Sequence, residues 1–103
     1  MIGREFKFHN GAKGSALAIR VIQKKRESKI VRVLRDGTVV VNLDPESTDI
    51  NHDLKNFIAS ILHIDQVRLD IIAGHEGPEK LLSILDMRPN EVQKSILEMN
   101  KVE

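Results

Sequence analysis

Apolar side chains recur at every second position in the first half of the chain. Between residues 15 and 23 this alternation places Leu17, Ile19 and Val21 on one side of an extended segment, which is typical of a half-buried strand. Two valine-rich runs, 29–34 and 38–43, then flank Asp36-Gly37, a dipeptide that favours a tight hairpin turn. We therefore expect a meander of three strands.

The second half of the chain begins with a helical pattern. Apolar residues from Ile50 to Leu62 recur at intervals of three and four and form one stripe, after the N-cap formers Thr48 and Asp49. Alternation then returns in a predicted strand over 67–74, and a second short strand is predicted over 81–85. Pro89 suits the first turn of a closing helix. Its predicted apolar face contains Val92, Ile96 and Met99.

Helices with one apolar stripe and strands with one apolar face pack as two layers. We expect an α/β (α+β) fold in which a mixed sheet of four to five strands carries two helices on one face. A length of 103 residues suits one domain over 1–103. Within it we expect a core over 15–86, a C-terminal helix over 87–103 and an N-terminal segment over 1–14, where Phe6 and Phe8 allow a short edge strand.

Composition excludes several classes of function. The chain has no cysteine, which removes disulfides, thiolate metal sites and cysteine nucleophiles and favours a reducing compartment. No apolar run has the length of a membrane span, and the first residues lack the apolar core of a signal peptide. We therefore expect a cytoplasmic protein without a membrane partner. The net charge of +1 means that attraction for polyanions must come from local clusters.

The stretch from residue 48 to residue 80 resembles the signature of the YggU-like proteins, a family of small and largely uncharacterised proteins. Asn51 in the first helical turn, Gly74 at the end of a strand and Lys80 before the last strand match the family pattern. The resemblance implies a two-layer α/β fold with a mixed sheet and no established activity. The chain departs from the pattern at Thr48, Ile50 and Pro78, where the family has glycine, alanine and arginine, and at Gln23, which replaces a proline.

Two explanations fit Asn51, which should face inward. Its amide either ties down the loop 44–48, because a buried amide needs hydrogen-bond partners, or converges with Lys80 and Gly74 around an anionic ligand. In the second explanation the amide donates a hydrogen bond and the ammonium group supplies the counter-charge. The proline at position 78, where the family has an arginine, counts against the anion site.

Basic residues form the one cluster that suggests nucleic-acid binding. Four of them share one connection, and three occupy predicted strand positions that point away from the helices. Glu27 and Asp70 weaken the electrostatic field of the cluster, and lysines that protect a solvated sheet edge are the commoner explanation for such residues. With 3% aromatic residues and no Trp or Tyr, we expect contact with a nucleic-acid backbone without base stacking. The seven residues are Lys24, Lys25, Arg26, Lys29, Arg20, Arg32 and Arg68.

The four histidines do not have the spacing of a metal site. His52 and His63 are eleven residues apart on one helix, and His9 and His75 lie in predicted loops. We expect no metal and no cofactor. The functional expectation is a non-catalytic binding module for RNA or an RNA–protein complex. The alternatives are a protein-interaction adaptor that uses a strand edge or the closing helix, and a small enzyme or anion site at Asn51 and Lys80.

Overall fold

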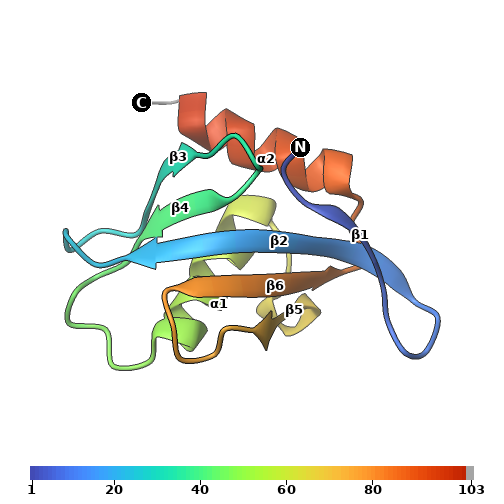
Figure 1. Cartoon of the computed structure of the whole chain (residues 1–103), viewed down its shortest axis with the longest axis horizontal. Coiled ribbons are helices and arrows are strands. Elements are labelled where there is room, and N and C mark those ends of the chain that lie inside the picture. The colour runs from blue at the N-terminus through green and yellow to red at the C-terminus, as the bar shows by residue number, and fades with distance from the viewer. Residues whose placement is uncertain (102–103) are drawn as a thin grey trace.

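The computed structural model describes residues 1–101. Six strands form one mixed sheet, with α1 behind it and α2 along its upper edge in the view of Figure 1. The predicted two-layer α+β fold is confirmed, with six strands in place of four to five. In chain order the elements are β1 (Arg4–Lys7), β2 (Lys13–Ile22), β3 (Lys29–Val33), β4 (Val39–Asn42), α1 (Ile50–Leu62), the 3-10 turn η1 (Gln66–Arg68), β5 (Leu69–Ala73), β6 (Glu79–Leu85) and α2 (Pro89–Lys101).

The strand order is β3-β4-β2-β6-β5, and the predicted meander is wrong. β4 pairs with β2 in parallel and separates it from β3. The three valines of β4 are buried on both faces, as in interior strands, whereas β3 alternates and takes the edge. β2 has ten residues, so β1 also pairs with its first half and provides the sixth strand.

Both helices bury most of their predicted apolar stripes. Asp49 caps α1, since its Oδ1 accepts a hydrogen bond from the backbone N–H of His52 at 3.1 Å. Leu54, Ile58, Ile61 and Leu62 of α1 are buried in the core, and each such side chain stabilises the fold by roughly 1.5–3 kcal/mol. This packing fixes the first turn of α1 beside the loop between β5 and β6.

In α2, Val92 and Ile96 are fully buried, but Met99 is 45% exposed, so the predicted apolar face ends at Ile96. The helix runs from Pro89 to Lys101, and the last two residues of the predicted helix lie outside the described residues. Within residues 1–101, neither helix has both the length and the apolar character needed to cross a bilayer.

The segment before β5 differs from the prediction. Val67 was expected inside a strand, but it lies in η1 and is 82% exposed. The reason is local: the carboxylate of Asp65 accepts a hydrogen bond from the Val67 N–H at 3.0 Å and holds a 3-10 turn. Arg68 therefore occupies this turn and not a strand. Its guanidinium donates to the carbonyl oxygens of Leu85 at 3.0 Å and Asp86 at 2.7 Å.

Candidate functional site

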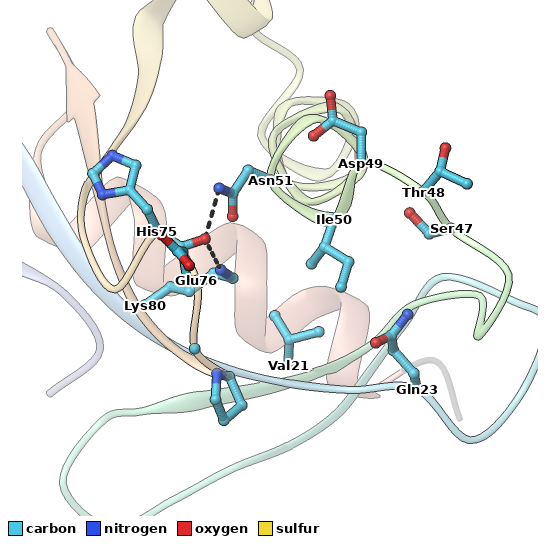
Figure 2. Close-up of a pocket in the computed structure, with 12 residues that line it drawn as sticks. Val21, Gln23, Ser47, Thr48, Asp49, Ile50, Asn51, His75, Glu76 and Lys80 are labelled. Atoms are coloured by element: carbon cyan, nitrogen blue, oxygen red, sulfur yellow. Dashed lines mark hydrogen bonds between the residues drawn. The ribbon is translucent and has the colours of Figure 1, made fainter.

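A pocket with a volume of about 370 Å³ lies where the first turn of α1, the β5–β6 loop and the end of β2 meet. Figure 2 looks along the axis of α1 and shows Asn51 and Lys80 on the same side of this pocket. Three separate parts of the chain supply its walls. The lining residues are Val21, Gln23, Ser47, Thr48, Asp49, Ile50, Asn51, His75, Glu76, Gly77, Pro78 and Lys80.

Lys80 is a charged residue at a core position. It lies opposite Ile19 in the β2–β6 register, and alternate residues of β6 fill the core, so its side chain must face the helices. Only 6% of the residue is exposed, and this burial lowers the pKa of its amine. The Nζ atom donates to the carbonyl oxygens of Gly74 at 2.9 Å and His75 at 3.1 Å.

No carboxylate of the described chain forms an ion pair with Lys80. An ammonium group has three donors, and the two carbonyl oxygens take two of them. Carbonyl dipoles offset part of the cost of burying the charge, but they carry no net charge of their own. The third donor and the positive charge therefore remain available to an anionic group.

Asn51 donates from Nδ2 to the same carbonyl oxygen of His75, at 2.9 Å. The predicted link from Asn51 to the loop 44–48 is thus wrong, because the amide ties α1 to the β5–β6 loop. The 44–48 loop is held by Ser47, whose hydroxyl donates to Asp53 at 2.5 Å, and by Asp44, whose carboxylate accepts from the Glu46 N–H. The Oδ1 atom of Asn51 is enclosed and has no hydrogen-bond partner within residues 1–101.

Gly74 shapes the loop that supplies these carbonyl groups. Its φ of +75° is in the left-handed region, and a Cβ atom there would lie 1.9 Å from the carbonyl oxygen of Glu79. Only glycine fits this turn without displacing β6. The structure therefore brings together Asn51, Gly74 and Lys80, the three positions that match the YggU-like pattern.

The basic residues are spread over more of the surface than predicted. Arg20 pairs with Glu79 and Arg26 with Glu46, while Arg32 is exposed on β3 in the same row as Arg20. Arg68 bonds to the end of β6, and Arg20 to its beginning, so about 20 Å of strand separates them. Arg68 does not share a surface with the others.

The connection between β2 and β3 is held by one buried side chain, Asn42, which is 3% exposed. Its Oδ1 accepts from the backbone N–H groups of Lys24 at 2.9 Å and Lys25 at 3.3 Å. Its Nδ2 donates to the carbonyl oxygens of Lys25 and Glu27, both at 2.8 Å. Because Asn42 ends the run of β4 valines, the sequence pattern suggested only the end of a strand and not this brace.

A second hollow of about 510 Å³ lies on the helix-free face. Phe6 and Phe8 line it as an edge-to-face pair with ring centroids 4.8 Å apart, and both are half-buried. Base stacking was not expected from the composition, so this aromatic pair is a feature that sequence reasoning missed. Its signal was the i, i+2 spacing of two phenylalanines, one in β1 and one directly after it. The other lining residues are Lys7, His9, Asp70, Ile72 and Ser83.

The histidines remain apart from one another. His52 contacts Asn56 through Nε2, and His63 ends α1 in a left-handed conformation with φ +58°. In the described part of the chain, no three His, Asp or Glu side chains come together as a metal site would require. Comparison with protein-family models and with curated proteins found no match to this chain. The YggU-like assignment therefore stays a prediction from the residues.

Proposed function

We propose that the protein is a non-catalytic binding module that holds RNA, or the RNA of an RNA–protein complex, by its phosphate backbone. The contact surface is the basic loop, residues 24–29, together with Arg20 and Arg32. The observation that supports this most is the brace from Asn42, which fixes the backbone of Lys24 and Lys25 before any ligand arrives. A loop ordered in advance loses less entropy on binding. A cytoplasmic location and membership of the YggU-like family are part of this proposal.

The charges on this surface suit a phosphate backbone. Lys24 and Lys25 are exposed, and Arg26 is paired with Glu46 by side chains that are 80% and 70% exposed. Exposed ion pairs contribute little to stability, so Arg26 can exchange its carboxylate partner for a phosphate at small cost. Contacts to phosphates carry no base information, so we expect affinity that depends on charge and hardly on base sequence.

The experiment is a salt series with a single-stranded RNA 12-mer and the variant Lys24→Glu/Lys25→Glu. The matched control is Arg4→Glu/Lys94→Glu, which changes the net charge equally at two exposed residues away from the loop. Affinity of the wild type should fall steeply with salt, and the loop variant should lose binding while the control keeps it. Affinity that does not change with salt, or equal losses in both variants, contradicts the proposal.

A protein-interaction adaptor is the second candidate, supported by exposed apolar residues on α2. Leu97 and Met99 are 36% and 45% exposed on the closing helix. A partner on this surface would bind through apolar burial, which salt does not weaken. If the variant Leu97→Ser/Met99→Ser lost a salt-resistant complex with a protein partner while its RNA binding was unchanged, this result would favour the adaptor.

A further inference from the structure

We propose that the pocket between α1 and the β5–β6 loop binds a phosphate group, with Lys80 as its counter-charge. The site is separate from the basic loop and would exist if that loop bound nothing. A volume of about 370 Å³ is within the range of small-ligand pockets and larger than one phosphate needs. The ligand class is therefore a phosphate monoester, which carries an organic substituent into the rest of the pocket.

The first argument is the uncompensated charge. Lys80 is almost fully buried, lines the pocket and has two neutral carbonyl partners but no carboxylate among the described residues. A buried charge is usually paired, because burial without a partner is costly. A bound dianion would supply the missing opposite charge and accept the third N–H of Nζ.

The second argument is that other polar groups around Lys80 lack hydrogen-bond partners. The backbone N–H groups of Ile50 and Asn51 lie in the first turn of α1 and form no hydrogen bond within the described chain. The enclosed Oδ1 of Asn51 also lacks a partner, but it is an acceptor, so it needs a donor such as a hydroxyl group on the organic substituent of the ester and does not itself hold the phosphate. Unpaired N–H groups at the start of a helix attract anions, and the residues that carry them, Ile50 and Asn51, line the same pocket as Lys80.

Two carboxylates also line the pocket and oppose an anion. Asp49 is committed to the cap of α1 through the N–H of His52, and Figure 2 shows its carboxylate pointing away from Lys80. Glu76 is on the exposed part of the β5–β6 loop. Glu76→Gln should therefore tighten phosphate binding by a modest factor, about twofold, because it removes an exposed like charge.

The test is an NMR titration of the full chain with inorganic phosphate, which needs no variant to be interpreted. Shifts in the backbone amides of Ile50, Asn51 and residues 74–76, with saturation, support the site. The same titration with Lys80→Met should bind at least tenfold more weakly, while Lys94→Met, at an exposed lysine, should bind as the wild type does. A wild type without saturable shifts at these amides, or a folded Lys80→Met that binds equally well, overturns the proposal.

Two further probes distinguish the source of the phosphate group. An RNA trinucleotide with a 5′-phosphate is compared with the same trinucleotide without it. Tighter binding of the phosphorylated trinucleotide than of inorganic phosphate identifies an RNA end as the source. Equal affinity of the phosphorylated trinucleotide and of inorganic phosphate favours a small phosphate ester, because the nucleotides then add nothing. Either result supports the pocket, whereas equal shifts of the pocket amides with the two trinucleotides contradict it. The basic-loop variant Lys24→Glu/Lys25→Glu should retain at least half of the affinity for inorganic phosphate, so failure of the proposed RNA surface and failure of this site give different results.

Discussion

Asn51 and Lys80 donate to one acceptor, the backbone carbonyl oxygen of His75, at 2.9 Å and 3.1 Å. These residues are 29 positions apart and come from α1 and β6, so a single loop carbonyl joins a helix to a strand across the end of the sheet. The carbonyl oxygen is in place because Gly74 adopts a left-handed turn. The geometry of the pocket therefore depends on this turn.

Gly74→Ala should destabilise the protein by about 2–4 kcal/mol, because the new Cβ would meet the Glu79 carbonyl oxygen and the backbone would be strained at φ +75°. Gly77→Ala in the same loop is the matched control, since nothing lies within 4 Å of its added Cβ. Its effect should stay within about 0.5 kcal/mol. Urea unfolding measures both, and equal losses would show that the turn does not need glycine.

Lys80→Met should change how stability depends on pH. Burial lowers the pKa of Lys80 below the ordinary value of 10.5, so between these two values the unfolded chain binds more protons than the folded chain. Wild-type stability should therefore gain relative to Lys80→Met as the pH rises through this window toward 10.5. Urea unfolding at pH 7, 8.5 and 10 measures the difference. A difference that stays constant with pH would show that Lys80 is not desolvated.

Asn42→Ala should cost about 2–6 kcal/mol, since the four hydrogen bonds to the β2–β3 connection are lost and each contributes roughly 0.5–1.5 kcal/mol. The backbone amides of residues 24–28 should also exchange faster with solvent, because the brace is gone. Hydrogen exchange and urea unfolding measure the two effects. Asn56→Ala, at an exposed position of α1, serves as the control and should change neither. A stable variant with an unchanged loop would remove the main support for the RNA surface.

The hydrophobic periodicity of the sequence was sufficient to predict the two layers, because it indicates which side of each helix or strand is buried. The stripe of α1 and the apolar row of β2 face the core as predicted. Strand order was not predictable in this way. Pairing β4 with β2 in parallel depends on long-range packing, and only the unbroken valine run of β4 indicated an interior strand.

The candidate site was predictable in part. The sequence suggested the convergence of Asn51, Gly74 and Lys80 as one of two explanations for Asn51. It did not predict the hydrogen-bond partner of Asn51, because a backbone carbonyl group leaves no mark in the side-chain pattern. The brace from Asn42 was missed for the same reason. Arg68 was misplaced because Val67 continues the alternation of β5 by coincidence, while the capping carboxylate of Asp65 decides the local structure.

Val67→Ala tests this reading of the segment before β5. Val67 is 82% exposed, so its truncation should change the free energy of unfolding by no more than about 0.5 kcal/mol. Ile71→Ala, at a buried position of β5, should cost about 2–5 kcal/mol. A loss at Val67 comparable with the loss at Ile71 would restore the strand that the alternation suggested.

The most direct test of the proposed function is NMR mapping of the single-stranded RNA 12-mer on the wild-type chain. We expect the largest amide shifts in residues 23–29, with smaller shifts at Arg20 and Arg32. The amides of Phe6 and Phe8 report the aromatic hollow, and Arg68 reports the far end of the sheet. Shifts confined to either of those places, or no shifts at low salt, would contradict the basic loop as the RNA-binding surface.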